Sequence, residues 1–160
     1  MFFVRKIAAA KWKQSLIQAD DFNADPITGC LRTSGNTLSL WKIETLADIE
    51  EAILALASNF ERLDKMDIIT MSDEEIKAAN LQLENNEGNG KYYDYNNHHF
   101  DIVNITYSTL NPVASIVSDK VLNNKHTRYS TTDLKNILNK GIEAKKIKKE
   151  DLSKKLREAL

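Results

Sequence analysis

The sequence predicts an α+β protein, with a small mixed or antiparallel sheet, a central apolar helix and a mostly helical C-terminal part. Three observations support this class. Short β-rich segments separated by turn residues fill the first 84 residues, one segment there is apolar almost all round, and helix-start signals dominate the second half. We expect a single domain over residues 1–160, made of an α+β half (1–84), a polar loop (85–97), a helical part (98–142) and a basic C-terminal helix (143–160).

Composition narrows the class of protein. The chain has 160 residues, of which 42% are apolar and 28% charged, which is enough to form a core without covalent staples. A single cysteine excludes an internal disulfide. The longest apolar run, residues 52–57, is six residues, whereas a membrane helix needs about 18. The N-terminal charge order does not fit a secretory signal, so we expect a cytoplasmic protein without a membrane span.

The first strands are predicted from β-branched and aromatic residues. Residues 2–7 form a strand with apolar residues on both faces. The turn residues at 34–36 separate two further β-rich segments, 30–33 and 37–43, which indicates a hairpin. Residues 66–71 predict the next strand of the sheet.

Two helices are predicted between and after these strands. Thr45 followed by Asp48 marks the start of the first, and its apolar residues recur at spacings of three and four up to Phe60. Alanines widen this apolar stripe until the helix is apolar most of the way round, so it is expected to lie centrally. The sequence from Ser72 to Glu75 is a capping box that predicts a second, short helix.

The second half is predicted to be helical. Phe100, Val103, Tyr107 and Leu110 have helical spacing, although the neighbouring Ile and Val residues leave a strand open. A proline at 112 suits the first turn of the next helix. Ser130 with Asp133 predicts another helix start, and Glu150–Asp151 predicts the opening of the last helix, whose basic residues come late.

Charge is unevenly distributed along the chain. Residues 1–119 carry 10 basic and 18 acidic side chains, a net charge of −8, whereas residues 120–160 carry 12 and 5, a net charge of +7. Such asymmetry is typical of a segment with its own partner. Three lysine pairs within this basic end are candidate partner-binding residues: Lys145, Lys146, Lys148, Lys149, Lys154 and Lys155.

The long polar loop and its C-terminal border hold the other candidates. Loops of about 12 residues or more are commonly functional, and tyrosine is enriched in protein interfaces, so Tyr92, Tyr93 and Tyr95 are also candidate partner-binding residues. His98, His99 and Asp101 form the densest group of ligand-type residues. On a helix His98 and Asp101 share a face, whereas in a strand His99 and Asp101 do. Two ligands do not make a metal site, so we expect neither a metal nor a cofactor.

The first sixty residues support a different hypothesis. Arg5 lies on an early strand, Thr37 and Ser39 lie on another, and Glu50 and Glu51 follow on a helix. This layout resembles that of NAD-consuming toxins of the ADP-ribosyltransferase and RES types. The resemblance implies that a cation binds the dinucleotide phosphates and a carboxylate steadies the sugar cation, which makes Arg5, Ser39 and Glu51 the candidate catalytic residues.

Three functions follow from these patterns. The chain contains no complete catalytic motif, and its Asn, Ile and Lys bias (47 of 160 residues) is typical of AT-rich bacterial genes. We therefore expect a bacterial protein that binds another protein with an acidic surface, such as an accessory, antitoxin or immunity component of a toxin or defence system. The alternatives are a nucleotide-consuming toxin enzyme and a nucleic-acid-binding protein that uses the lysine-rich end.

Overall fold

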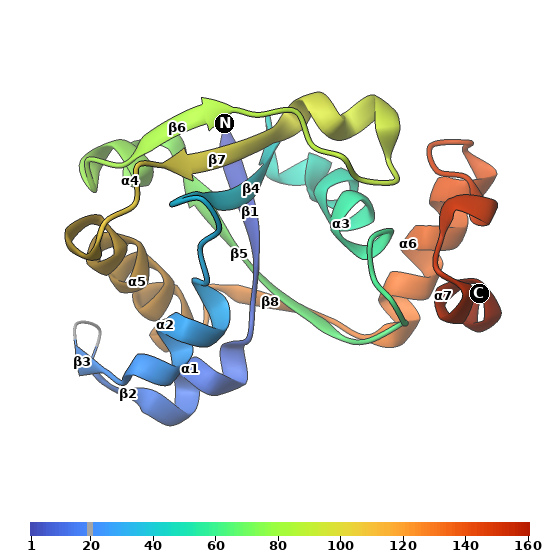
Figure 1. The fold of residues 1–160 in the computed structure, drawn as a ribbon. Coiled ribbons are helices and arrows are strands. Elements are labelled where there is room, and N and C mark those ends of the chain that lie inside the picture. The colour runs from blue at the N-terminus through green and yellow to red at the C-terminus, as the bar shows by residue number, and fades with distance from the viewer. Residues whose placement is uncertain (19–20) are drawn as a thin grey trace.

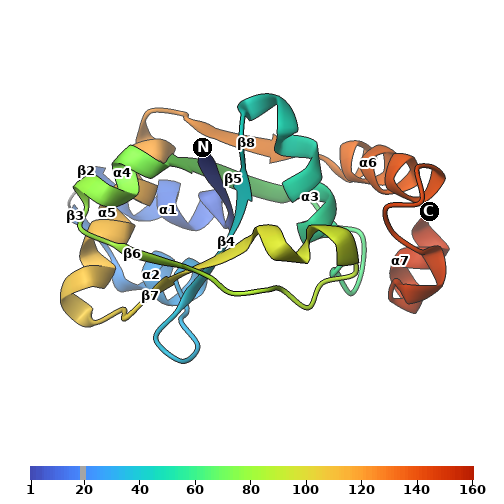
Figure 2. The ribbon, with the colours of Figure 1, turned by 90° about the horizontal axis from the view of Figure 1, so that it is seen from above.

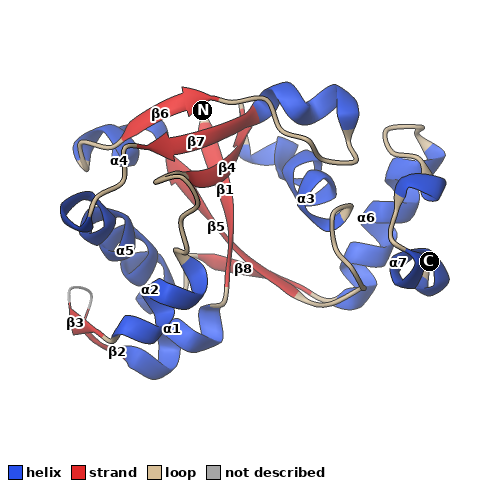
Figure 3. Cartoon of the chain, viewed as in Figure 1, coloured by secondary structure: helices blue, strands red, loops and turns tan. Residues whose placement is uncertain are grey.

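A six-stranded antiparallel sheet forms the centre of the computed structural model, which describes residues 1–18 and 21–160 (Figures 1 and 3). The strands lie in the order β6-β7-β4-β1-β5-β8. This confirms the predicted α+β class and resolves the alternative left open, since each strand pair of the sheet is antiparallel. The strands are β1 (Phe2–Ile7), β4 (Leu38–Ile43), β5 (Met66–Ser72), β6 (Gln82–Asn85), β7 (His99–Val103) and β8 (His126–Tyr129), with a separate pair β2 (Leu16–Gln18) and β3 (Asp21–Phe22).

Helices cover both faces of the sheet (Figure 2). Alternate residues of a strand point to opposite faces, so Phe3 and Val4 of β1 lie in two different cores and are both fully buried. The Phe3 core is covered by α1 (Ala9–Ser15), α2 (Ala24–Cys30), α4 (Asp73–Ala78) and α5 (Tyr107–Leu122). The Val4 core is covered by α3 (Ile49–Ala57), α6 (Thr131–Glu143) and α7 (Lys154–Ala159).

The predicted central apolar helix is α3, which follows the short 3-10 helix η1 (Leu46–Asp48). The main-chain N–H of Thr45 donates to the Asp48 carboxylate at 2.9 Å, as the predicted helix start requires. Ala52, Ile53 and Ala55 are completely buried. Because α3 contacts β1, β4 and α6, almost its whole circumference is covered, which explains its apolar sequence.

The sheet opens between its two middle strands. β1 pairs with β5 along its full length, from Phe2 to Ile7, but its pairing with β4 runs only from Phe2 to Val4. On its opposite edge β4 pairs with β7, through Leu38 to Trp41. Beyond Val4 the two central strands therefore separate, and side chains rather than main-chain hydrogen bonds fill the gap.

Several sequence-based expectations are wrong. Residues 30–33 are not a strand, because α2 extends to Cys30, and the expected hairpin is reduced to one bridge between Ser34 and Thr37. Residues 99–103 form the strand β7, which is the alternative that the helical prediction had left open. The strand β8 also lies inside the segment that was expected to be helical. The proline at 112 lies inside α5 and not in its first turn, because the capping pair Thr106 and Thr109 starts this helix earlier.

The C-terminal arm, residues 144–160, folds onto the body of the protein. Ile147, Leu152 and Leu156 are each at most 3% exposed and belong to the same core as α3. The expected helix at Glu150 is a single 3-10 turn, η3 (Lys149–Asp151), and the α-helix starts only where the Ser153 hydroxyl accepts from the Leu156 N–H at 3.1 Å. Over the residues described, none of the helices combines the length and the hydrophobicity needed to cross a bilayer.

Candidate functional site

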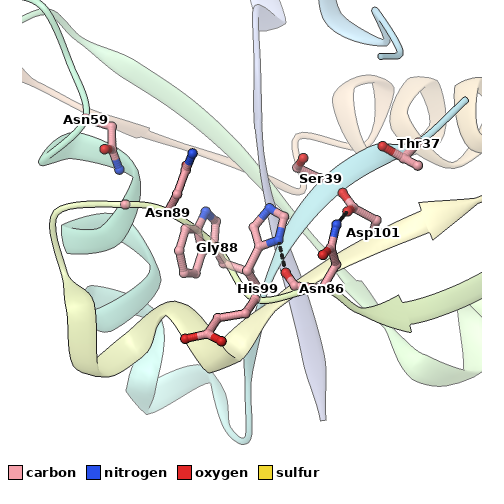
Figure 4. A pocket seen from close by; sticks show the side chains of 11 residues that line it. Thr37, Ser39, Asn59, Asn86, Gly88, Asn89, His99 and Asp101 are labelled. Carbon is pink, nitrogen blue, oxygen red and sulfur yellow. Dashed lines mark hydrogen bonds between the residues drawn. The ribbon is translucent and has the colours of Figure 1, made fainter. Parts of the chain in front are cut away.

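A polar pocket of about 340 Å³ lies between β4, β7 and the segment 86–90 (Figure 4). β4 and β7 provide its floor, and the segment that follows β6 forms its rim. Its lining is mostly amide, hydroxyl and carboxylate groups. The lining residues are Thr37, Ser39, Trp41, Asn59, Asn86, Glu87, Gly88, Asn89, Gly90, His99 and Asp101.

Strand register brings residues from distant parts of the chain together in this pocket. Ser39 of β4 pairs with Asp101 of β7, and Trp41 pairs with His99. Directly opposed residues of antiparallel strands point to the same face, so these four side chains share one face of the sheet. His99 and Asp101 therefore lie together, as the strand interpretation predicts. His98 does not join them: it ends the 3-10 helix η2 (Tyr93–His98), and its ring stacks on Tyr95 at 4.3 Å.

The hydrogen bond of His99 to Asn86 places a proton on Nδ1. Its Nδ1 lies 2.7 Å from the main-chain oxygen of Asn86, which is an acceptor only, so Nδ1 carries the proton and donates it. In the neutral ring Nε2 is then an acceptor. The edge-to-face contact between His99 and Trp41, with centroids 5.1 Å apart, holds the imidazole in place.

Asp101 is the most unusual group in the pocket. The residue is only 3% exposed, and its Oδ2 accepts a hydrogen bond of 2.8 Å from the Asn86 side chain. Its Oδ1 is buried and has no hydrogen-bond partner among the described residues. Leaving such an acceptor unpaired costs about 1–3 kcal/mol, more when it is charged. The fold therefore holds an unpaired carboxylate oxygen at the pocket.

Arg5 fills the gap between β1 and β4, beside this carboxylate. Its Nη1 donates to the main-chain oxygen of Ser39 and its Nη2 to that of Cys30, both at 2.7 Å. Burial lowers the pKa of the Arg5 guanidinium to about 10, while the Cys30 thiol and the Asp101 carboxylate act in the opposite direction. The guanidinium stays charged at neutral pH and holds together strands that no longer pair with each other.

The segment 86–90 approaches the sheet closely because it contains glycine. A Cβ at Gly88 would lie 3.1 Å from the His99 Cβ and 3.2 Å from the Trp41 ring, so a larger residue would push the segment outward. The buried Asn96 ties it down, since its side-chain oxygen accepts from the Gly90 N–H at 3.0 Å and its side-chain nitrogen donates to the Gly90 oxygen at 3.2 Å. Sequence reasoning missed Asn96, because the composition of residues 85–97 predicted only a long polar loop.

Glu51 lies in a different part of the molecule from Arg5 and Ser39. Its carboxylate accepts a hydrogen bond of 2.8 Å from the Tyr92 hydroxyl and pairs with Lys146 of the C-terminal arm. Together with Glu50, Lys140 and Lys146 it lines a separate small pocket. The structure therefore brings together two of the three candidate catalytic residues and engages the third in contacts between α3, the tyrosine-rich loop and the arm.

The three candidate tyrosines have different environments. Tyr92 and Tyr95 are buried, and the Tyr95 hydroxyl donates to the main-chain oxygen of Lys42 at 2.7 Å. Burial raises the pKa of both phenols, and for Tyr92 the hydrogen bond to Glu51 adds to this effect. Tyr93 is 53% exposed, and its hydroxyl donates to Asp151 of η3 at 3.0 Å. These side chains connect the loop to the body and to the arm.

The candidate lysines divide into one that binds the body and five that face outward. Lys146 pairs with Glu51, and on α6 the neighbouring Lys140 lies 3.6 Å from Glu50. The other five are exposed and constitute what we call the lysine surface: Lys145, Lys148, Lys149, Lys154 and Lys155.

The donor set at the pocket and comparisons with known proteins give no further identification. Within residues 1–18 and 21–160, no cluster of three or more His, Cys, Asp or Glu side chains is arranged to hold a metal ion. No protein-family model matches this chain, and neither the curated proteins nor the solved structures contain a match to it.

Proposed function

We propose that this protein acts in the bacterial cytoplasm by binding an acidic partner protein through the lysine surface, as an accessory, antitoxin or immunity component does. The single observation that carries the proposal is the combination of five exposed lysines with a buried apolar side of the same arm. Because Ile147, Leu152 and Leu156 anchor the arm, the lysines form part of a folded surface, and a partner need not order a flexible tail when it binds.

The charge pattern favours a protein over a nucleic acid. Exposed carboxylates of Glu143, Glu150 and Glu158 alternate with the lysines, and they would repel a continuous run of phosphates. The five cations of the surface are lysines, which lack the fork suited to base edges, and Arg157 of α7 directs its Nη1 to the main-chain oxygen of Glu150 at 2.9 Å. A protein surface that carries separated acidic groups is complementary to this pattern, and the complementarity would raise its association rate.

The nucleotide-consuming alternative has less support. Arg5 directs two N–H groups to main-chain oxygens, so those groups do not face a ligand phosphate. Glu51 is occupied by Tyr92 and Lys146. These contacts account for Arg5 and Glu51 as parts of the folded framework, whereas the exposed Ser39 hydroxyl lines the polar pocket.

Charge reversal at the lysine surface tests the proposal. The variant Lys148→Glu/Lys155→Glu changes two exposed lysines of the arm, and the control Lys65→Glu/Lys125→Glu changes two exposed lysines elsewhere by the same total charge. Each protein is used as bait in a lysate of its native host, and captured proteins are identified by mass spectrometry. The partner is then purified, and its association rate is measured at low and at physiological salt.

We expect the wild type and the control to capture the same acidic protein, and the arm variant to bind it at least about tenfold more weakly, mainly through slower association. Equal binding by the arm variant and the control would overturn the proposal. Capture that nuclease treatment abolishes would instead support a nucleic-acid partner.

A further inference from the structure

We propose that the pocket between β4, β7 and the segment 86–90 binds a small neutral ligand rich in hydroxyl groups, such as the sugar ring of a monosaccharide or a nucleoside. The inference is independent of the lysine surface, which belongs to the C-terminal arm. It starts from Asp101, which lines the pocket and whose Oδ1 is buried without a hydrogen-bond partner among the described residues (Figure 4).

Asp101 requires a hydrogen-bond donor from its ligand. The residue is only 3% exposed, and the Asn86 side chain donates a hydrogen bond to only one of its two carboxylate oxygens. A ligand that donates to this carboxylate from the pocket would complete its hydrogen-bond shell, with a small shift of the side chain to bring Oδ1 to the pocket surface. Because Asn86 also fixes the His99 ring through its main-chain oxygen, one residue orients both side chains.

The other polar side chains of the pocket are complementary to a ligand that both donates and accepts hydrogen bonds. When the His99 ring is neutral its Nε2 is an acceptor, because Nδ1 carries the proton. The side-chain oxygen of Asn59 is also an acceptor, and the Asn59 side-chain nitrogen donates to the Ala55 main chain. The Ser39 hydroxyl and the Asn89 amide can donate as well as accept. Each hydroxyl of a sugar can both donate and accept a hydrogen bond, so a row of neighbouring hydroxyls is complementary to these side chains.

Charge disfavours an anionic ligand, and the hydrogen-bonding groups of the pocket disfavour a cationic one. The carboxylates of Asp101 and Glu87 line the pocket and oppose a phosphate or another anion. An ammonium group offers no acceptor to the Ser39 hydroxyl or the Asn89 amide. It would also lie near the Arg5 guanidinium, whose charge already interacts with Asp101. A neutral polar ligand avoids both penalties.

The size and construction of the pocket agree with this ligand class. Its volume of about 340 Å³ lies at the lower end of the range of about 300–1,000 Å³ found for ligand pockets. The close approach at Gly88 and the bonds from Asn96 to Gly90 hold the rim in position. The ligand therefore meets polar groups that are largely pre-arranged, which lowers the entropic cost of binding.

Ligand-observed NMR with defined probes tests the inference. Saturation transfer from the full chain is measured to D-ribose, D-glucose, adenosine and uridine, with inorganic phosphate and putrescine as the anionic and cationic probes. The test variant is Asp101→Asn, in which the amide oxygen can keep the bond to Asn86 while its NH₂ group replaces the acceptor at the pocket.

Two further variants make the result specific. Asp67→Asn is the matched control, because Asp67 is also a buried carboxylate of the sheet but pairs with Arg128 outside the pocket. Ser39→Ala removes one exposed hydroxyl of the pocket and decides the test if Asp101→Asn does not fold.

We expect saturable binding of at least one hydroxyl-rich probe to the wild type and to Asp67→Asn. Both pocket variants should bind it about tenfold more weakly or worse. No binding by any of the four sugar-containing probes would overturn the inference, as would binding of phosphate or putrescine only. Equal binding by the wild type and the folded pocket variants would refute the assignment of the pocket.

Discussion

The hydrogen bond between Tyr92 and Glu51 predicts that substitutions of these two residues are coupled in their effect on the free energy of unfolding. Such coupling is expected if the pair stabilises the fold. Glu51 of α3 accepts from the Tyr92 hydroxyl at 2.8 Å, and both residues are sequence-based candidates for function. If they instead hold the loop, α3 and the arm together, their removal must affect stability in a coupled way. A double-mutant cycle of Tyr92→Phe and Glu51→Ala measures this coupling.

The magnitude follows from burial. Tyr92 is 7% exposed, so Glu51→Ala leaves a buried hydroxyl unpaired, at a cost of about 1–3 kcal/mol. The lost pair with Lys146 adds about 0.2–1 kcal/mol, because the two side chains are 31% and 38% exposed and water screens them. We expect Glu51→Ala to cost about 2 kcal/mol, Tyr92→Phe about 1 kcal/mol, and the pair to couple by about 1 kcal/mol.

Urea unfolding followed by circular dichroism gives the four free energies of unfolding. Glu51→Gln is the control, because its amide oxygen still accepts from Tyr92 and its cost should stay below about 1 kcal/mol. A coupling energy near zero would refute the structural role of the pair.

Three other substitutions probe the framework. Gly141→Ala in α6 should destabilise the protein by about 1 kcal/mol in urea unfolding, because its Cβ would lie 2.7 Å from a buried Leu54 methyl. The control Gly29→Ala should stabilise the protein by up to about 1 kcal/mol, because its Cβ meets only the flexible end of the Lys11 side chain. Equal effects of the two substitutions would contradict the close packing of α6 on α3. Leu156→Ala should cost about 2–5 kcal/mol and expose the arm to trypsin, whereas unchanged proteolysis would mean that the arm is not anchored there. The hydrogen bonds from Arg128 hold the pKa of Asp67 below its ordinary 3.8, so this pair stabilises the fold above about pH 4, and that stability is lost as pH falls through the lower folded pKa. When the free energy of unfolding is measured against pH, Asp67→Asn should lack this acid-side decrease. Identical acid-side curves for the variant and the wild type would argue against the pair.

Local signals in the sequence determined several elements directly. The capping boxes at Ser72–Glu75 and Ser130–Asp133 start α4 and α6 where they were expected. The apolar stripe from Ile49 onward predicted a central helix, because a helix that is apolar all round must be covered on all sides. These features depend on residues three or four positions apart, so the sequence contains the whole signal.

Other elements depend on pairing between distant strands. β8 consists of polar residues without apolar alternation, and it becomes a strand because β5 pairs with it and Asp67 binds Arg128. Residues 99–103 fit a helix or a strand by their spacing, and only their pairing with β4 and β6 decides for the strand.

The sequence by itself therefore determined the fold class, the central helix and the concentration of lysines at the C-terminal end. Only the tertiary structure decided that Asp101 and His99 lie beside Ser39 and Trp41 on the floor of a polar pocket, that Glu51 binds the arm, and that five lysines point outward. The physical reason is that a side chain's neighbours across a sheet are set by strand register. Register joins residues as far apart as 39 and 101, where no local pattern reaches.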